Sequence, residues 1–580
     1  MNAELEAVLS YHQTSKHGFK AYASGPRFLD MEIKPDPFLS YRGAPVLKLD
    51  TWDEKNINTE LLPGYEQVFC PEKLEPSGIS RRSISQLFFD SFALSVWKKA
   101  GSARWPLRIN PSSGNLHPTE VYLISGPVPG LLKKPSVCHY SPLPHALELR
   151  AEFSGETWKK LSSGFPEGTF FIGLTSIYWR VAWKYGVRAF RYANHDLGHA
   201  IAALSFAASG LGWKACLLAD MASEDIAKVL GISGRQGPEK EDPACLLAVY
   251  PAGKECISGK VSSSAIPDFE KLYWAGVPDR LSPAHVEWAG IEKASSVTRK
   301  GNTNHFGEKQ AEPKPEIQTS GLSGEVPDHG THSDLEAAPL RRVIHMRRSA
   351  IEMNNSAYME KEDFYGMLRR TLPDKNPVLN TLPFGPFSHL LLFVNRVKEL
   401  FPGLYIFLRK SGEKEMLKSR FRPDFLWEKP ESCPHELELY MLVEENLYDF
   451  AAQLSCSQRK AADACFTACM LSEFEGPLKK FGSWVYPYLF WECGILGQLL
   501  YLEAEARGFR GCGIGCFFDD PLHETLGLKG LEYQDLYHFA VGSPLQENGV
   551  VTYPADGKSH IIFFSPGSQN VFRIVFVRGS

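Results

Sequence analysis

The second half of this 580-residue chain repeats the first half at a fixed spacing. Lys184 and Gly186 recur 296 residues later as Lys480 and Gly482, and no gap is needed. The same spacing pairs further residues of equal or similar type: Tyr192 with Tyr488, Asp196 with Glu492, Gly198 with Gly494, Gly212 with Gly508, Lys214 with Arg510, Cys216 with Cys512, Leu230 with Leu526 and Gly231 with Gly527. A repeated unit of this length has the size of a domain, so the sequence predicts two domains that share one fold.

The segment between the two repeats differs in composition from both. From about residue 290 to residue 340, Ser, Thr, Gly, Pro, Lys and Glu dominate and aromatic residues are scarce. Such a segment buries too little apolar surface to offset its ordering entropy. We therefore predict an N-terminal domain over residues 1–285, a flexible polar linker over 286–340 and a C-terminal domain over 341–580.

Each repeat contains a short apolar strand candidate that is followed by a long helix. The strands are predicted at residues 169–175 and 465–471, and the helices at residues 194–209 and 488–507. The first helix is apolar on nearly all sides and rich in alanine, which is typical of a buried helix that packs closely. Its obvious partner is the helix of the other repeat, so the chain is expected to fold as an internal pseudo-dimer.

The composition narrows the classes of partner. The net charge is -4 and no segment concentrates Lys and Arg, which argues against nucleic acid and favours a small-molecule substrate.

The twelve cysteines are scattered without a CxxC pair, as expected in a reducing, cytoplasmic compartment, and the N-terminus does not resemble a secretory signal. Residues 484–502 are apolar, but Pro487, Glu492 and Gly494 interrupt them, so we predict a buried helix and no membrane span.

An Arg-Arg-Ser triplet occurs early in each half. The two triplets are Arg81, Arg82 and Ser83, before a helical-looking segment at residues 86–99, and Arg347, Arg348 and Ser349 at the corresponding position of the second half. Arginine offers planar, charged donors that suit phosphate, and a serine beside a helix N-terminus adds a hydroxyl and backbone amides. A single triplet is also typical of a solvated helix start, but its recurrence favours a phosphate site.

A second motif stands before the strand predicted at residues 120–125. It consists of Pro111, Ser112, Ser113, Gly114 and Asn115. Such a loop presents backbone amides and hydroxyls, and its glycine permits close approach of a ligand. A surface turn is the alternative interpretation of this motif taken by itself.

These motifs, followed by Lys184, Tyr185, Gly186 and Arg188 before a glycine-containing helix, resemble the nitroreductase superfamily. Within this superfamily, the motifs resemble more specifically the SagB-type dehydrogenases and the azoline oxidases of thiazole and oxazole biosynthesis. It covers most of residues 10–255 and, in a weaker form, residues 340–545. The fold that it implies is α+β: two nitroreductase-like domains, each an antiparallel sheet flanked by helices, that form an intrachain pseudo-dimer.

The resemblance also implies a cofactor. In this family FMN sits at a dimer interface, where an Arg-x-Ser element of one subunit holds the phosphate and the Pro-Ser loop of the other meets the isoalloxazine. Carried over residue by residue, the phosphate candidates are Arg81, Arg82, Ser83, Arg347, Arg348 and Ser349. The flavin-ring candidates are Pro111, Ser112, Ser113, Gly114 and Asn115. Ser112 and Arg348 are then expected to open onto one common cavity.

The azoline oxidases use an adjacent lysine and tyrosine, which correspond to Lys184 and Tyr185. Dehydrogenation beside a heteroatom requires removal of a proton as a hydride leaves for flavin N5. A neighbouring ammonium would favour the tyrosine phenolate and make it a stronger base. The alternative is that Lys184 faces solvent and Tyr185 packs against the core.

The second half departs from the pattern in two places. Phe481 replaces the tyrosine, and the region before the strand predicted at residues 390–394 reads Thr-Leu-Pro-Phe-Gly-Pro, with no Pro-Ser-Ser-Gly. We therefore expect one competent FMN site per chain, formed by the ring loop of the first half with Arg347, Arg348 and Ser349. The site anchored by Arg81 would lack its partner loop.

The sequence thus predicts a SagB-type, FMN-dependent oxidoreductase that transfers hydride to or from a small organic substrate. An NAD(P)H-dependent nitro or quinone reductase is one alternative, and a decayed flavin-binding or partner-binding scaffold is another. No metal site is expected, because Cys465, Cys469, Cys512 and Cys516 lack the usual ligand spacing and are typical of buried small residues.

Overall fold

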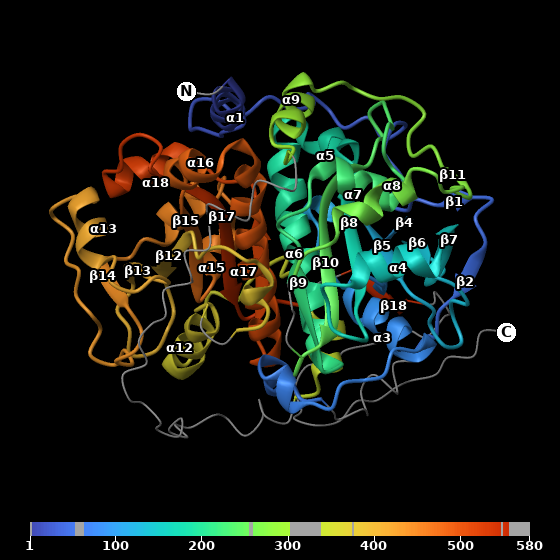
Figure 1. The fold of residues 1–580 in the computed structure, drawn as a ribbon. Helices are drawn as coiled ribbons and strands as arrows, with labels where there is room; N and C mark the ends of the chain where they lie inside the picture. Colours follow the sequence, from blue (N-terminus) through green and yellow to red (C-terminus); the bar gives the residue numbers. More distant parts are fainter. Residues whose placement is uncertain are drawn as a thin grey trace.

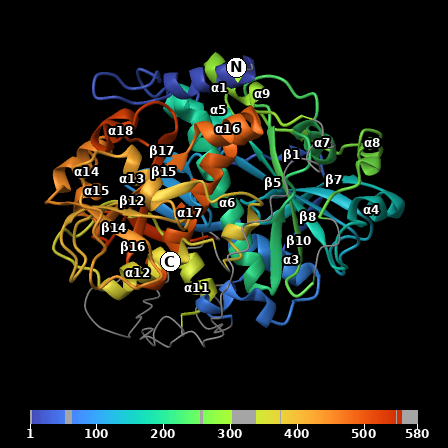
Figure 2. The same cartoon turned by 60° about the vertical axis from the view of Figure 1, so that its left-hand side comes forward.

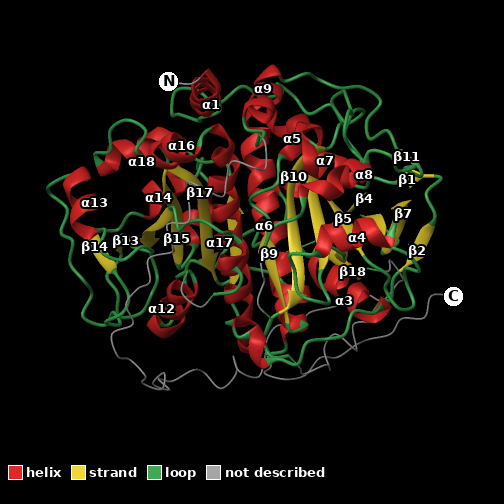
Figure 3. Ribbon diagram, viewed as in Figure 1, coloured by secondary structure: helices red, strands yellow, loops and turns green. Residues whose placement is uncertain are grey.

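A computed structural model describes residues 3–52, 63–254, 259–301, 338–373, 376–546 and 549–555. The chain forms two lobes that lie side by side, with the N-terminal half on the right and the C-terminal half on the left of Figure 1. In each lobe a sheet is flanked by helices, as the colouring by secondary structure shows (Figure 3). Among these residues, no helix is both long and apolar enough to cross a membrane.

Lobe 1 is built on a seven-stranded sheet in the order β2-β7-β6-β5-β8-β10-β9, in which all neighbours are antiparallel. Its strands are β2 (Val46–Lys48), β5 (Thr119–Ser125), β6 (Ser136–Ser141), β7 (Ala146–Glu152), β8 (Phe170–Ser176), β9 (Trp213–Leu217) and β10 (Asp242–Pro251). Its main helices are α3 (Arg81–Ser91), α4 (Gly155–Ser162), α5 (Tyr178–Tyr185), α6 (Ala189–Gly210), α7 (Ser223–Leu230) and α9 (Ala289–Val297).

Lobe 2 repeats this arrangement with six antiparallel strands in the order β14-β13-β12-β15-β17-β16. The strands are β12 (Ser388–Val394), β13 (Gly403–Phe407), β14 (Leu439–Glu444), β15 (Phe466–Glu473), β16 (Arg510–Ile514) and β17 (Tyr533–Gly542). The helices include α11 (Leu340–Met346), α12 (Lys361–Arg370), α13 (Lys414–Arg420), α14 (Tyr448–Leu454), α15 (Arg459–Asp463), α16 (Glu475–Phe481), α17 (Tyr486–Ala506) and α18 (Asp519–Leu526). The predicted α+β class with two like domains is confirmed.

The long helices α6 and α17 form the contact between the lobes. Nearly all of their residues are buried, as expected for helices that are apolar on most sides. They cross at two glycines that the repeat makes equivalent, since a Cβ on Gly198 would lie 2.2 Å from Trp491 O and one on Gly494 would lie 2.2 Å from His195 O. Only glycine lets the two backbones approach so closely, so the predicted pseudo-dimer is confirmed at its centre.

The lobes also exchange segments at both ends of the chain. Helix α1 (Ala3–Thr14) reaches lobe 2, where the two ring nitrogens of His12 hydrogen-bond Tyr486 OH and Gln534 Oε1, both at 3.1 Å. Conversely, β18 (Val551–Pro554) pairs with β3 (Leu94–Ala100), which forms a hairpin with β4 (Ala103–Arg108) in lobe 1. The view in Figure 2 shows α1 above the junction of the lobes.

Two predictions about local structure were wrong. Residues 86–99 do not form one helix, because α3 ends at Ser91 and residues 94–100 form β3, whose apolar and aromatic side chains pair with β4. Within the predicted linker, residues 289–297 form α9, which buries Ile291, Ala294 and Val297. Residues 302–337 of that linker lie outside the described residues.

Candidate active site between the lobes

The predicted ring loop is fixed by one buried carboxylate of α6. Asp196 Oδ2 accepts a hydrogen bond from Ser112 Oγ at 2.6 Å, and Oδ1 accepts from Ser113 N and Ser113 Oγ, both at 2.9 Å. Burial raises the pKa of Asp196 to about 7, although the hydrogen bonds from the two serines oppose this rise. The loop is therefore held in one geometry against the central helix.

The predicted catalytic tyrosine, Tyr185 at the end of α5, packs against this loop. Gly114, Asn115 and His117 all have a positive φ, of 63°, 59° and 52°, which turns the loop sharply. A Cβ on Gly114 would lie 2.6 Å from Tyr185 OH, so only glycine leaves room for the phenol. The structure thus brings Tyr185 together with Ser112, Ser113 and Gly114.

The protonation of Tyr185 differs from the expectation. Burial, and then the nearby Asp196, raise the pKa of the Tyr185 phenol above its usual value. Lys184 lies with Nζ 5.3 Å from the centre of the tyrosine ring, and burial followed by the positive charge of Lys34 lowers the pKa of its ammonium. A phenolate is therefore not favoured, and Tyr185 is suited to donate a proton while Lys184 is the more readily deprotonated member of the pair.

Arg347 of lobe 2 faces the same loop. Its side chain is 4% exposed, and Nη2 donates to Arg108 O at 3.3 Å. Its Nε and Nη1 have no hydrogen-bond partner among the described residues, and the same holds for Asn110 Oδ1 and His117 Nδ1 close by. Unsatisfied buried groups are costly, and such a cluster indicates a place where a polar or anionic ligand binds.

The other two members of the second triplet have partners within lobe 2. Arg348 donates from Nη1 to His345 O at 2.8 Å and to Arg347 O at 2.6 Å. Ser349 Oγ lies 2.8 Å from Tyr501 OH, which in turn accepts from Gly513 N at 2.9 Å. Of the triplet, Arg347 is therefore the residue with buried donors that remain available.

The first triplet lies elsewhere and is used in the fold. Arg81 pairs with Asp50 at 2.9 Å, and the exposed Arg82 stacks over Trp52. Ser83 completes a reciprocal cap with Ser80 at the start of α3. The expected equivalence of the two triplets was wrong, because Arg81 begins a helix whereas Arg347 follows the end of α11.

The second lobe holds its own loop by the equivalent carboxylate. Glu492, which the repeat pairs with Asp196, accepts from Phe387 N at 2.8 Å. The loop before β12 has Phe384, Gly385 and Pro386 where the first lobe has serine hydroxyls. In both lobes, a carboxylate of the central helix therefore holds the loop by hydrogen bonds, but only the loop of lobe 1 offers serine hydroxyls.

Sequence reasoning missed several residues of this site. Asp196 was recognised only as a repeat position, Arg108 and Asn110 directly precede the predicted loop but were given no role, and Tyr501 was not considered. The signal for Asp196 was present, since an acidic residue on an otherwise apolar buried helix requires hydrogen-bond donors. The donors themselves are some 80 positions earlier in the chain, so only the fold identifies them.

Two cavities lie between described residues, with volumes of about 40 and 10 Å³. The larger is bordered by Asn194, Asp242 and Tyr488, and the smaller by Asp90 and Arg341. Ser112 and Arg348 line neither cavity, so neither provides the common space that was expected between these two residues.

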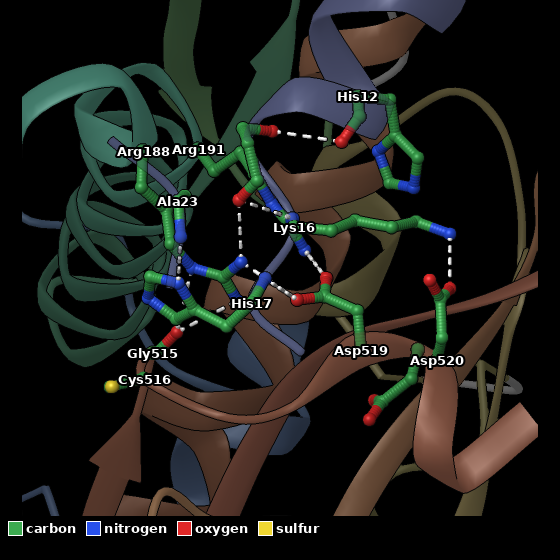
Figure 4. Close-up of polar contacts among 12 residues, drawn as sticks. His12, Lys16, His17, Ala23, Arg188, Arg191, Gly515, Cys516, Asp519 and Asp520 are labelled. Atoms are coloured by element: carbon green, nitrogen blue, oxygen red, sulfur yellow. Dashed lines mark hydrogen bonds and ion pairs between the residues drawn. The ribbon is translucent and has the colours of Figure 1, made fainter. Parts of the chain in front are cut away.

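A second set of charges joins the lobes close to this site. Arg188 Nη1 and Arg191 Nη2 lie 2.8 and 2.7 Å from the two carboxylate oxygens of Asp519, and all three side chains are buried. Figure 4 shows both guanidinium groups converging on this carboxylate beside His17. The cluster fixes the orientation of lobe 2 relative to α6.

Comparison with known proteins supports the two-lobed fold. The nitroreductase family model matches residues 81–254 and 435–543, and no curated protein matches the chain. The structure is similar to that of a protein described as a nitroreductase from Anabaena variabilis, with a TM-score of 0.64 and 20% identity over 93% of this chain and 99% of that one. Two further matches cover less of this chain. A protein described as a nitroreductase from Ralstonia eutropha is 13% identical over 39% of this chain and 97% of that one, with a TM-score of 0.26. The E. coli microcin synthetase McbBCD complex with truncated pro-MccB17 bound is 22% identical over 42% of this chain and 92% of that one, with a TM-score of 0.25.

The match to the Anabaena protein extends over both lobes, and the two family segments fall one in each lobe. A segment of each lobe therefore matches the nitroreductase family model, and the chain has the nitroreductase fold in a two-domain arrangement.

Proposed function

We propose that this chain is a SagB-type, FMN-dependent oxidoreductase with one flavin site between the lobes. The observation that carries the proposal is the buried guanidinium of Arg347 beside the loop that Asp196 holds, since two of its nitrogens, Nε and Nη1, have no hydrogen-bond partner in the described part of the chain. The guanidinium lies over the Tyr501 ring, at 5.0 Å from its centre. Burial lowers the pKa of Arg347, although Tyr501 and Glu505 oppose this, and such a buried cation is stabilised further by an anion or acceptors from a ligand.

The residues present fit FMN in their chemistry. Arg347 offers charge-assisted donors to a phosphate, and Ser349 adds a hydroxyl next to it. Asn110 Oδ1 and the hydroxyl oxygens of Ser112 and Ser113, whose protons are donated to Asp196, offer acceptors to the polar edge of a ring. The described cavities, of about 40 and 10 Å³, are too small for a flavin ring and are not lined by Arg347 or Ser112, so side chains between the lobes have to move when a ring binds.

When bound, FMN supplies a two-electron centre that accepts or gives a hydride at N5. The residues of the chain position the substrate and move the proton. Tyr185 remains protonated at neutral pH and can donate from its hydroxyl. Burial, and then Lys34, lower the pKa of Lys184 and so make its ammonium easier to deprotonate, and the neutral amine can accept a proton from the substrate. The substrate class that suits this pair is a small organic molecule, such as an azoline, with a hydrogen next to a heteroatom.

A decayed, partner-binding scaffold is the second candidate, because the cavities that are described are small. An anaerobic titration distinguishes the two. The purified full chain, incubated with FMN and freed of excess, should show a flavin spectrum that bleaches with NAD(P)H or with an azoline substrate. Protein that remains colourless supports the scaffold, and bleaching by NAD(P)H with nitroaromatics or quinones as the best acceptors supports a nitro or quinone reductase.

Arg347→Gln should weaken FMN binding by roughly 10- to 100-fold, because a charge-assisted hydrogen bond contributes about 1.5–3 kcal/mol. Fluorescence titration of the apoprotein measures this change in Kd. Arg81→Gln is the matched control and should leave Kd unchanged, since Arg81 pairs with Asp50 away from the loop. Equal effects of the two substitutions on the Kd for FMN would show that Arg347 does not bind the cofactor.

Tyr185→Phe should keep FMN bound but lower turnover by about 100-fold or more, the usual contribution of a general acid or base. Steady-state oxidation of an azoline substrate and the FMN content of the variant are the two measurements. Tyr192→Phe is the control, because Tyr192 packs edge-on against Tyr185, with 4.6 Å between the ring centres, whereas it is Tyr185 OH that a Cβ on Gly114 of the loop would meet. Unchanged turnover in Tyr185→Phe would show that the phenol takes no part.

We also infer that the two lobes arose by tandem duplication. The shared strand order, the crossing of Gly198 with Gly494 and the matched roles of Asp196 and Glu492 support this origin.

A further inference from the structure

Two cysteines of lobe 2 lie with their sulfur atoms in contact. Cys516 Sγ is 2.8 Å from Cys456 Sγ, and both side chains are half-buried. Cys456 lies in the turn between α14 and α15, and Cys516 lies between β16 and α18. Segments that are 60 residues apart in the chain therefore present two thiols to each other.

The turn that carries Cys456 has an unusual backbone. Cys456 and Ser457 have φ values of 52° and 59°, a region that non-glycine residues seldom adopt. Gln458 follows, and its Nε2 donates to Ser455 O at 2.9 Å and to Cys516 O at 3.1 Å. The amide thus ties the two thiol-bearing loops together, and strain of this kind persists where the surrounding structure fixes it.

The surroundings of the pair favour a thiolate on one sulfur. The hydrogen bond shared with Cys456, and then His17 and Arg188, lower the pKa of Cys516, although burial opposes this. Arg188 also donates to Gly515 O at 3.2 Å, which holds the positive charge beside Cys516, and Figure 4 shows the sulfur of Cys516 near the His17 ring. The hydrogen bond shared with Cys516, and then burial, raise the pKa of Cys456, so Cys456 is the partner that stays protonated.

We propose that Cys456 and Cys516 are a redox-active dithiol that reacts with small disulfides such as glutathione disulfide. The Cys516 thiolate attacks one sulfur of the external disulfide, which breaks that S–S bond and releases one thiolate. Cys456 then loses its proton and attacks Cys516 Sγ in the mixed disulfide, which releases the second thiolate. One intrachain disulfide and two small thiols result, so the protein is oxidised by two electrons and the external disulfide is reduced.

The oxidation state of the two cysteines can affect the site between the lobes, because the residue next to Cys516 contacts an aromatic ring that packs against Tyr185. A Cβ on Gly515, the residue before Cys516, would lie 2.5 Å from the Tyr192 ring, which in turn packs against Tyr185. On the outer side lies Tyr22, which is 59% exposed and close enough to the pair that the thiols affect its pKa. The inference does not depend on the proposed flavin chemistry, because both sulfurs belong to the chain itself.

The direct test is oxidation of the purified full chain with glutathione disulfide, followed by alkylation and mass spectrometry without reduction. A peptide pair linked through Cys456 and Cys516 is expected, and it should disappear on treatment with dithiothreitol. Cys456→Ser should leave glutathione trapped on Cys516, whereas Cys516→Ser should trap none on Cys456. Cys70→Ser, which removes a half-buried cysteine elsewhere, should leave the cross-link intact.

The absence of the linked peptide from oxidised wild-type protein would overturn the inference. A second measurement does not require the disulfide to form. The rate of iodoacetamide reaction at Cys516 should be nearly constant from pH 6.5 to 8.5, whereas an ordinary thiol gains roughly 50-fold over this interval. The titratable and charged groups around the pair are His17, Tyr22, Tyr185, Arg188, Tyr192 and Asp519. A rate at Cys516 that rises like that of Cys70 would contradict the thiolate that the mechanism requires.

Discussion

Replacing Asp519 with alanine is expected to destabilise the chain by about 3–5 kcal/mol, the usual effect of leaving a buried charge without its partner. Asp519 is fully buried and accepts from Arg188 and from Arg191 of lobe 1, so the substitution leaves two buried guanidinium groups uncompensated. It also removes the acceptor of His17 N, which lies 2.8 Å from Asp519 Oδ2. Urea unfolding monitored by tryptophan fluorescence measures this loss.

The neighbouring residue provides the control for this substitution. Asp520 pairs with Lys16 at 2.7 Å, but its side chain is 45% exposed, so Asp520→Ala should cost less than about 1 kcal/mol. Arg188 and Arg191 hold the pKa of Asp519 well below its usual value, so its contribution is present above the unfolded pKa of about 4 and is lost only as the pH falls further. The difference between the two variants should therefore be constant from pH 6 to 8. Equal stabilities of the two variants would contradict the role assigned to the cluster.

Substitution of Gly494 by alanine is expected to disrupt the packing of the lobes. The new Cβ would lie 2.2 Å from His195 O and 2.8 Å from Gly198 Cα, and both of these are backbone atoms that cannot turn away. The helices α6 and α17 have to separate, which loosens the largest buried contact between the lobes. We expect a loss of more than about 4 kcal/mol, or no folded protein at all.

Gly476 serves as the matched control for Gly494. It also lies in a helix, α16, but a Cβ at this position meets nothing within 4 Å. Gly476→Ala should be neutral or slightly stabilising, because alanine has the higher helix propensity. Gly198→Ala should behave like Gly494→Ala. A thermal unfolding midpoint of Gly494→Ala close to that of Gly476→Ala would show that the helices do not cross as described.

The sequence predicts the repeated architecture well and the local use of its motifs less well. The spacing of 296 residues identified both central helices because buried helices and their glycines leave a strong pattern. The Arg-Arg-Ser triplets were misleading, since three identical residues take up a helix start in one lobe and a helix end in the other. Short motifs do not define their secondary structure, which depends also on the residues next to them in the chain.

Contacts between distant segments were beyond sequence reasoning. The cysteines were interpreted as scattered small residues, and only the topology of lobe 2 brings Cys456 to Cys516. The pKa of Tyr185 was expected to fall beside Lys184, but burial and Asp196 have the larger effect and raise it. Both results depend on solvent exposure and on neighbours from other elements, and neither of these can be obtained from local sequence.

The amount of flavin per chain tests the central claim most directly. The full chain should be reconstituted with FMN, freed of excess, and denatured so that the released flavin is compared with the protein concentration. One FMN per polypeptide is the predicted result, because Arg347 supplies buried cationic donors and the Ser112 loop of lobe 1 supplies polar groups, whereas the loop of lobe 2 lacks the serines. Two FMN per polypeptide, or none, would contradict it.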